Sequence, residues 1–435
     1  MPNNPPVTKA DRIRALGLST LAFTVCFAVW TLFSIIGVSI KEELGLSDTR
    51  FGLLVATPVL TGSVSRLFLG VIVDRYGGRI VFPLQMLLTA LAVWAMSWAE
   101  SFAMFLVAAL FLGLAGGSFI IGVAYVSRWF EPRHQGSALG FFGVGNVGAA
   151  VTNFGAPFLV VALGWEGTAR VYALVLALMA VLFYLLARPD PLQRERRAGA
   201  RPTPGLAAQL APLRDPRVWR FSGYYFFSFG AFVALASFLP RYYVGAYGLE
   251  LTLAGVLAGL YSLPGSVFRA LGGWMSDRSG ARFVNYLALL CSLPILLVMS
   301  FPGSRFTLEG IGGTISFELS VSLPLFVGLS VLLGFLMSLG KAAVFKYIPS
   351  YYPEHIGPVG GMVGMIGGLG GFFLPIAFGF LLDVTGIWTA PFMLLFAIVA
   401  ATALWMHMAV RRIERTAAGP AARRAPEDNG SGVAA

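Results

Sequence analysis

Charged residues and cysteines are both scarce in this sequence. Only 12% of its 435 residues are charged, whereas 57% are hydrophobic and 14% are aromatic. Because soluble domains carry about 25% charged residues, this composition excludes an ordinary soluble protein and indicates a chain that crosses a membrane several times. The two cysteines, Cys26 and Cys291, lie inside apolar runs, so no disulfide framework or cysteine metal site is implied.

Twelve apolar runs are each long enough to cross a bilayer, which takes about 20 residues. The predicted spans are residues 18–40, 51–73, 80–98, 102–126, 137–163, 169–187, 219–244, 251–275, 283–301, 320–347, 359–382 and 389–410. The first run is too long for a cleaved signal peptide and is followed directly by Lys41, Glu42 and Glu43. The fold class predicted is therefore an all-α membrane protein with twelve transmembrane helices.

The positions of the basic residues explain the formal net charge of +11. These residues gather in alternate connections and in the terminal segments, whereas the other connections hold few, chiefly Lys41, Arg50, Arg241 and Arg305. Since cytoplasmic loops of membrane proteins are enriched in Lys and Arg, we expect both termini on the cytoplasmic side of the cytoplasmic (inner) membrane. The charge therefore does not require a nucleic-acid partner.

One stretch of the sequence occurs twice. Residues 61–79, TGSVSRLFLGVIVDRYGGR, return as residues 264–282, PGSVFRALGGWMSDRSGAR, at a constant offset of 203. The offset pairs Arg66 with Arg269, Gly70 with Gly273, Asp74 with Asp277, Arg75 with Arg278, Gly77 with Gly280, and Arg79 with Arg282. The chain is therefore a tandem duplication.

The duplication divides the chain into two halves of six spans each, which stand in parallel. Pro132 and Gly136 match Pro353 and Gly357 at an offset of 221, which is 18 more than the offset of 203. The longer connection 302–318 can account for these 18 additional residues. We expect residues 1–188 to form the first half, 189–217 a cytoplasmic linker, 218–411 the second half, and 412–435 a disordered cytoplasmic tail. Residues 206–213 of the linker can form a short helix at the membrane surface.

Each copy of the duplicated stretch places one arginine inside an apolar run. A charge there costs at least about 2.5–3.5 kcal/mol on insertion scales, so by default it faces the protein interior or a water-filled path. The alternative is that the side chain snorkels to the headgroups. We favour burial, because Arg66 lies roughly 10 Å before the end of its span and its helical side chain leans toward the bilayer centre.

The motif Gly70-x-x-x-Asp74-Arg75-x-Gly77-x-Arg79 and its second copy resemble the cytoplasmic signature that follows the second and eighth spans across the major facilitator superfamily. The resemblance implies two six-helix halves that rock about a site at the middle of the membrane. It also implies that the motif residues control conformational switching, with Asp and Arg pairing across the halves. The alternative is that these charges only mark the membrane boundary.

Two predicted spans are unusually rich in glycine, which is about 1 kcal/mol worse than alanine as a helix former. The glycines are Gly140, Gly143, Gly145 and Gly148 in the fifth span, and Gly364, Gly367, Gly368, Gly370 and Gly371 in the eleventh. Close helix packing alone could explain them. Together with the intramembrane arginines, however, these stretches resemble the paired signatures of the nitrate/nitrite porter family.

No aspartate or glutamate lies in the middle of a predicted span. The intramembrane cations Arg66, Arg269 and Lys341 therefore lack fixed partners in the sequence, and an unpaired buried charge is costly. We expect the substrate to supply the missing negative charge. Arginine suits a planar oxyanion because its rigid fork donates two parallel hydrogen bonds.

The resemblance implies a role for several residues. Arg66 and Arg269 match the substrate-binding arginines of the family, Asn146 and Tyr225 match further polar contacts, and Phe119 and Phe229 match rings that sandwich the anion. Outside these motifs the two phenylalanines would be ordinary packing residues.

Lys341 bears on the type of transport. Exchange-type members tend to carry an uncharged polar residue there, and the stretch around Lys341 resembles the nitrate/proton symporter type. A buried lysine can lose its proton near neutral pH, so Lys341 is a candidate proton carrier; a fixed charge that attracts anions is an equal alternative. Lys346, nearer the cytoplasm, is expected to snorkel to the membrane boundary.

The predicted function is secondary active transport of nitrate by nitrate/proton symport. Nitrate/nitrite antiport is the alternative, and a non-transporting anion receptor is a less favoured one. The expected partners are nitrate, nitrite as a second anion, protons and the lipid bilayer, with the chain acting as a monomer. No cluster of nucleophile, base and orienting residue stands out, so we expect neither an enzyme nor a cofactor or metal.

Overall fold

The computed structural model describes residues 7–46, 48–199, 205–311 and 313–417. Eleven of its helices are long and apolar enough to cross a membrane, and one of these, Pro132–Leu186, has 55 residues. That helix is interrupted at Gly164, whose φ of +70° is not helical and favours glycine. Since the fifth and sixth spans were predicted to separate at this point, the prediction of twelve crossings is confirmed for the described residues.

The first half begins with a capping box, in which Thr8 Oγ1 accepts from the Asp11 backbone N–H and the Asp11 side chain accepts from Thr8. Its elements are α1 (Lys9–Trp30), α2 (Phe33–Glu43), α3 (Asp48–Tyr76), α4 (Gly78–Met96), α5 (Phe102–Leu112), η1 (Gly113–Gly117), α6 (Ser118–Ser127), η2 (Pro132–His134), α7 (Gln135–Gly143), η3 (Val144–Val147) and α8 (Gly148–Leu186).

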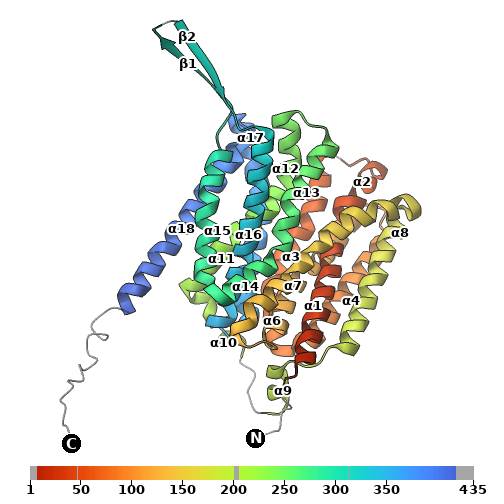
Figure 1. Ribbon diagram of the computed structural model, residues 1–435. Coiled ribbons are helices and arrows are strands. Elements are labelled where there is room, and N and C mark those ends of the chain that lie inside the picture. The colour runs from red at the N-terminus through yellow and green to blue at the C-terminus, as the bar shows by residue number, and fades with distance from the viewer. Residues whose placement is uncertain (1–6, 47, 200–204, 312, 418–435) are drawn as a thin grey trace, which may run out of the picture.

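The second half lies beside the first, as the red-to-yellow and green-to-blue helices of Figure 1 show. Its elements are α11 (Pro216–Tyr225), η5 (Phe226–Ala231), α12 (Phe232–Tyr247), α13 (Leu251–Val267), α14 (Arg269–Ser279), α15 (Ala281–Met299), α16 (Leu323–Tyr351), α17 (Ile356–Thr385) and α18 (Ala390–Ala417). The halves meet mainly where α3 packs on α17 and α7 packs on α14.

The connection between the halves contains more helix than predicted over its described residues. The expected short helix at 206–213 is confirmed as α10 (Leu206–Leu210) and η4 (Ala211–Arg214). A further helix, α9 (Pro191–Arg197), was not predicted; Asp190 caps it by accepting from the Gln193 backbone N–H at 3.0 Å.

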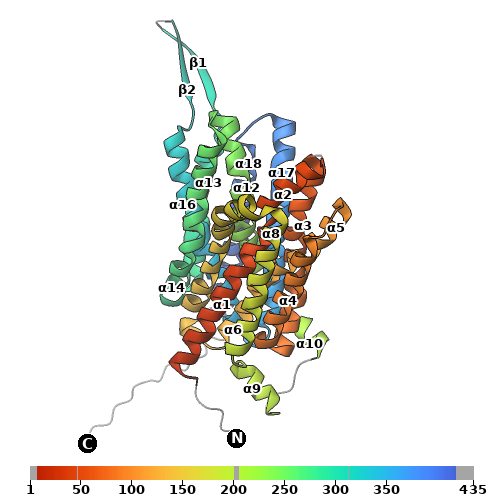
Figure 2. The ribbon, with the colours of Figure 1, turned by 90° about the vertical axis from the view of Figure 1, so that its right-hand side faces the viewer.

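A β-hairpin corrects the all-α prediction in the connection 302–318. Strands β1 (Ser304–Gly310) and β2 (Gly313–Leu319) pair antiparallel and project beyond the helices (Figures 1 and 2). The reason is a period-two alternation of apolar and polar residues, which places Phe306 opposite Phe317 on one face and the ion pair Arg305–Glu318 on the other.

The hairpin marks one end of the bundle, which we call the hairpin end. The opposite end, where α3 and α14 finish with the duplicated motifs, is called the motif end; α1 begins and α18 finishes there (Figure 1). Helix α18 continues to Ala417, so the tail predicted to start at residue 412 is helical over its first residues. The rest of that predicted tail, 418–435, lies outside the described residues.

Candidate functional site

Arg66 is buried between the two halves and is only 1% exposed. Its Nε donates to the Gly116 carbonyl at 3.0 Å, and one terminal nitrogen donates to the Gly364 carbonyl at 2.9 Å. The guanidinium lies 5.1 Å from the centroid of the Phe229 ring. Gly116 belongs to the first half, whereas Gly364 and Phe229 belong to the second, so this arginine is held by both halves.

Arg269 is the counterpart in the second half and is equally buried. Its guanidinium lies 4.6 Å from the centroid of Phe119 and 5.9 Å from that of Phe345. Its Nε and one terminal nitrogen have no hydrogen-bond partner among the described residues. A buried donor without a partner costs about 1–3 kcal/mol, so this guanidinium is prepared to bind an acceptor.

Glycines of the opposite half make room for both guanidinium groups. A Cβ atom at Gly143 would come closer than 3.0 Å to Nε and Cδ of Arg269. On the other side, a Cβ at Gly364 or Gly368 would lie 3.1–3.2 Å from side-chain atoms of Arg66. Three of the predicted signature glycines therefore face the two arginines directly.

The aromatic rings link the two arginines into one cluster. Phe345 contacts Phe119 and Tyr225, each at a centroid distance of 4.8 Å. Tyr225 in turn stacks on Phe229 at 5.1 Å. The structure thus brings together Arg66, Arg269, Phe119, Phe229 and Tyr225, as the sequence predicted, and adds Phe345. Whether the two rings sandwich an anion stays a prediction.

Two further polar atoms in the interior have no partner. The Tyr225 hydroxyl and Asn146 Oδ1 are buried and form no hydrogen bond among the described residues. Tyr225 ends α11 directly before η5, and Asn146 lies on η3. The assignment of both residues to the substrate stays a prediction, and their unused polar atoms are consistent with it.

Lys341 lies on α16 and is fully buried. Its Nζ donates to the Gly265 carbonyl at 2.6 Å and lies 3.4 Å from the centroid of Phe232. Gly265 is one helical turn from Arg269, with which Lys341 interacts electrostatically. The structure therefore places Lys341 beside the arginine cluster, held by a carbonyl and a ring.

Charge is the dominant property of this site. Arg269 lies within electrostatic range of both Arg66 and Lys341, and like charges in a poorly solvated interior repel one another. No carboxylate among the described residues forms an ion pair with any of the three. A small anion would relieve the repulsion and accept the unused hydrogen bonds.

Irregular helical turns surround the cluster. The segments η1 and η3 are 3-10 helices, and η5 is a π-helix. Such interruptions occur frequently at functional sites, because they free backbone groups from the regular pattern. The Gly116 carbonyl that binds Arg66 belongs to η1, so at least one of these interruptions positions a site residue.

Asp74 connects the halves at the motif end. Its Oδ1 accepts from the Gly357 backbone N–H at 3.2 Å, at the start of α17. The same oxygen accepts a short hydrogen bond from Arg128, which also reaches Asp190. Burial disfavours the charged guanidinium, but Asp190 and Asp74 outweigh it and raise the pKa of Arg128. The carboxylate is thus fixed by its own half while it caps a helix of the other.

Asp277 makes the equivalent contact in the opposite direction. It accepts from the backbone N–H groups of Gly136 and Ser137 at 2.8 and 2.6 Å, and from Ser137 Oγ at 2.7 Å, at the start of α7. Lys346 Nζ lies 2.6 Å from the carboxylate. Its ammonium group is thus held by this carboxylate and by the Pro132 carbonyl, and the expectation that Lys346 reaches the membrane boundary stays a prediction.

Glycines allow the backbones to cross at these two points. A Cβ atom at Gly70 would overlap the Gly357 carbonyl, and one at Gly273 would overlap the Gly136 carbonyl. A Cβ atom at Gly140 would likewise come too close to α14, at the Arg269 carbonyl. The helices α3 and α17, and α14 and α7, are therefore in backbone contact, which closes the motif end.

The motif arginines do not form the expected pairs across the halves. Arg75 and Arg278 lie over the neighbouring rings of Tyr76 and Trp274. Arg79 lies over Tyr184 of the same half. Arg282 pairs with Glu414 at 3.4 Å, so the pairing prediction is wrong. The Asp side chains bond to helix N-termini instead, because the partial positive charge there already attracts a carboxylate.

The other predicted glycines have local roles. Gly77 and Gly280 both adopt positive φ, 82° and 85°, where the chain turns after α3 and α14. The remaining signature glycines pack helices within one half: Gly145 and Gly148 face α1, and Gly367, Gly370 and Gly371 face α11, η5 and α12.

Sequence reasoning gave no role to Gly116, Phe345, Arg128 and Ser137, and it did not predict the contact of Lys346 with Asp277. These residues act through contacts between distant segments, which a single sequence does not reveal. One signal was present: Gly136 and Gly357 had been matched as repeat positions, and both prove to be the helix starts that the motif carboxylates cap.

Comparisons with known proteins agree with this architecture of two related halves around a buried site. The model of the Major Facilitator Superfamily matches residues 18–308. The probable nitrate/nitrite antiporter NarK1 of Thermus thermophilus is 42% identical over 421 residues, covering 93% of either chain. The nitrite extrusion protein of Bacillus subtilis is 30% identical over 396 residues, covering 90% of this chain and 94% of that protein.

A solved structure supports the fold alone. The human organic anion transporter MFSD10 matches with a TM-score of 0.69 at 17% sequence identity, covering 93% of this chain and all of that one. The fold and the duplicated motifs define a two-half membrane transporter. The chain belongs to the major facilitator superfamily and, within it, to the nitrate/nitrite porter family.

Proposed function

We propose that this protein transports nitrate across the cytoplasmic membrane by alternating access, with nitrate bound between Arg66 and Arg269. The observation that carries the proposal is a cluster of three buried cations, none of which forms an ion pair with a carboxylate among the described residues. Arg269 in particular has unused donors on two nitrogens, and a guanidinium fork matches the planar edge of an oxyanion. The printed names of the relatives, which concern nitrate and nitrite, support the choice of anion.

The contacts across the halves suggest how binding and movement are coupled. Each arginine side chain lies against at least one glycine and one aromatic ring of the opposite half. An anion between the two guanidinium groups would therefore draw the halves together at the site and lower the repulsion between them. The contacts of Asp74 and Asp277 with helix starts hold the motif end closed, and their release would let that end open.

We further propose that nitrate transport is coupled to the movement of protons. Lys341 is buried, interacts electrostatically with Arg269 and has no carboxylate partner among the described residues. It is therefore our candidate proton carrier in nitrate/proton symport. Nitrate/nitrite antiport is the second candidate, and it is favoured by the name of the 42% identical relative. In that mechanism Lys341 would serve as a fixed charge.

Flux into proteoliposomes tests the proposal. Purified protein would be reconstituted, and uptake of labelled nitrate would be measured with an inward proton gradient, with internal nitrite, or with neither. We expect uptake above that of protein-free vesicles, and little uptake with Arg269→Lys. Failure of the parent protein to move nitrate under every condition would reject nitrate transport, whereas the driving condition separates the two coupling modes.

The positions of the motif arginines also predict how the protein is oriented in the membrane. The motif end carries Arg75, Arg79, Arg278 and Arg282, and the positive-inside rule assigns such an end to the cytoplasm. We therefore place both termini in the cytoplasm, with the hairpin on the opposite side, and treat the transporting unit as a monomer. Protease cleavage at a site inserted in the hairpin of intact spheroplasts would support this orientation, and protection of that site would contradict it.

A further inference from the structure

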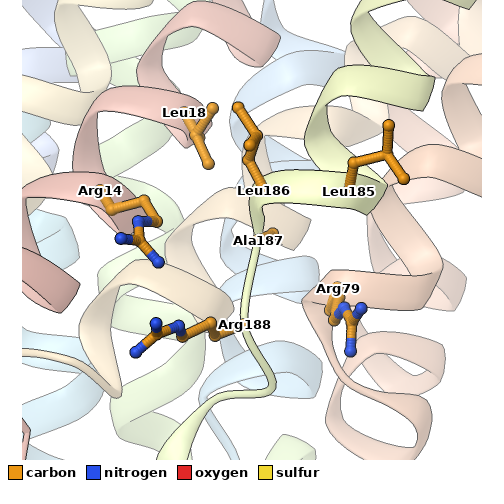
Figure 3. A pocket seen from close by; sticks show the side chains of 7 residues that line it. All are labelled: Arg14, Leu18, Arg79, Leu185, Leu186, Ala187 and Arg188. Carbon is orange, nitrogen blue, oxygen red and sulfur yellow. The ribbon is translucent and has the colours of Figure 1, made fainter.

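A cavity at the motif end lies away from the site between the halves. It has a volume of about 440 Å³ and is lined chiefly by three arginines and three leucines, Arg14, Arg79, Arg188, Leu18, Leu185 and Leu186 (Figure 3). They come from α1, from the start of α4 and from the end of α8 and the residues after it, all in the first half. The cavity is therefore not part of the path between the halves.

The arginines of this cavity carry unneutralised charge. Arg14 and Arg79 form no ion pair with a carboxylate among the described residues; Arg79 lies 5.3 Å from the ring of Tyr184, and its Nε has no hydrogen-bond partner. Arg188 donates to Asp11 Oδ1 at 2.8 Å, while the second oxygen of Asp11 accepts from Thr8. Of these three guanidinium groups, only that of Arg188 pairs with a carboxylate in the described part of the chain.

The polar and apolar groups are separated along the helices. On α1, Leu18 follows Arg14 by one turn toward the bilayer interior, and on the last turn of α8, Leu185 and Leu186 precede Arg188. Figure 3 shows Leu18 and Leu186 on one side of the cavity, with Arg14 and Arg188 on the other. The lining is therefore basic at the membrane boundary and apolar on the side of the bilayer.

The position of the cavity matches the headgroup level of a membrane. The starts of α1 and α4 and the end of α8 come together there, so the helices leave the bilayer at this level. Leu185, on the last turn of α8, is 68% exposed, and in a membrane such a side chain faces acyl chains. A ligand that fits has an anionic head and a long apolar tail.

We propose that this cavity binds the phosphate group of an anionic phospholipid from the leaflet at the motif end. Arginine forks bind phosphate oxygens in pairs, and basic pockets between transmembrane helices favour anionic headgroups. A soluble phosphate ion shares the anionic chemistry but gains nothing from the leucines. The lipid is therefore the ligand to which the amphiphilic lining points.

Native mass spectrometry of the delipidated full-length protein tests the proposal. The protein would be titrated in detergent with phosphatidylglycerol or with phosphatidylcholine. The test variant is Arg14→Gln/Arg79→Gln, which removes two charges and leaves the Arg188–Asp11 pair intact. The matched control is Arg411→Gln/Arg415→Gln on α18, which removes two charges at the same end of the molecule. We expect the parent and the control to bind one phosphatidylglycerol about tenfold more tightly than the test variant.

Further arms separate the possible outcomes. Arg14→Lys/Arg79→Lys keeps the charge and is expected to retain an intermediate affinity, which also shows that the cavity region tolerates substitution. Inorganic phosphate at millimolar concentration should not displace the lipid. Equal lipid binding by the parent and the Gln variant would overturn the proposal, as would an equal loss in the α18 control. Displacement by inorganic phosphate would identify the ligand as a soluble ion and would overturn it as well.

Discussion

Arg66 and Arg269 occupy matching positions, yet they are held differently. Arg66 donates from two of its nitrogens to the carbonyls of Gly116 and Gly364. Arg269 packs against aromatic rings, and two of its nitrogens have no partner in the described part of the chain. Because a buried unpaired donor is costly, an anion would stabilise the protein more through Arg269. Arg66 contributes charge, and its hydrogen bond to the Gly364 carbonyl fixes its contact with the second half.

Replacing either arginine with lysine should separate charge from geometry. Arg66→Lys and Arg269→Lys keep the positive charge but lose the fork. We expect each to weaken nitrate binding at least about tenfold, since a hydrogen bond to a charged group contributes about 1.5–3 kcal/mol. Titration calorimetry of the purified protein measures the affinity, with Arg305→Lys on the exposed hairpin as the control. A lysine variant that binds like the parent would show that its arginine does not contact nitrate.

Gly143 offers a test that leaves every charged residue in place. Gly143→Ala would place a methyl group where Nε and Cδ of Arg269 now lie, so the guanidinium must move. We expect nitrate affinity to fall about tenfold or more, because a displaced donor loses hydrogen-bond geometry. Gly155→Ala is the matched control, since nothing lies within 4 Å of its added atom. Equal affinity of the two variants would mean that the position of Arg269 is unimportant for binding.

At the level of helices, the motif carboxylates act as caps for helices of the other half. Asp277 satisfies two backbone N–H groups at the start of α7, and Asp74 satisfies one at the start of α17. A helix N-terminus carries about half a positive charge, so a carboxylate stabilises it more than a neutral amide does. All three bonds must break if the motif end is to open.

Substitution of these caps should therefore change the balance between conformations. Asp277→Asn keeps the shape of the side chain but removes its charge, which weakens the bonds to Gly136 and Ser137. We expect a larger population with the motif end open and an altered transport rate, whereas nitrate affinity stays within about twofold of the parent. Spin-label distances across α7 and α14 report the opening. A large loss of affinity without any change in those distances would contradict the role in switching.

Most helices could be predicted from the sequence because the hydropathy that marks a membrane span is a local property. The paired arginines could be predicted because the duplication repeats them. It did not predict what Asp74 and Asp277 bind, since those partners lie 283 and 141 residues away. The hairpin was not predicted, although its alternation of apolar and polar residues is local, because residues 302–318 were interpreted only as a longer connection. The prediction of Asp–Arg pairs across the halves failed because helix N-termini compete for the same carboxylates.

At the scale of the whole molecule, the proposed substrate site lies where the halves meet. The first half supplies Arg66 together with Gly143 and Phe119, which receive Arg269; the second half supplies Arg269 together with Gly364 and Phe229, which receive Arg66. Neither half has a complete site. Any movement that separates the halves at this level must change the site, which links binding to transport.

Lys341 adds a third buried cation to this pseudo-symmetric pair, and under the proposed function it is the candidate proton carrier. It hydrogen-bonds to Gly265 and lies near Arg269, without a carboxylate partner among the described residues. Since burial disfavours a charged amine, nitrate binding and protonation of Lys341 should support each other. In symport the pair would cross together; in antiport the lysine would stay charged while nitrate and nitrite exchange.

The variant Lys341→Asn distinguishes these cases. If Lys341 carries the proton, the variant should lose nitrate accumulation driven by an inward proton gradient, yet retain exchange against internal nitrite, because both arginines remain. Labelled nitrate flux into proteoliposomes at matched external nitrate measures both modes, and Lys346→Asn serves as a control that alters the motif end and leaves Lys341 in place. A parent protein that ignores the proton gradient but responds to internal nitrite would establish antiport. Full acid-driven accumulation by Lys341→Asn would instead leave symport in place and make Lys341 a fixed charge, with the proton carried by water or by the anion.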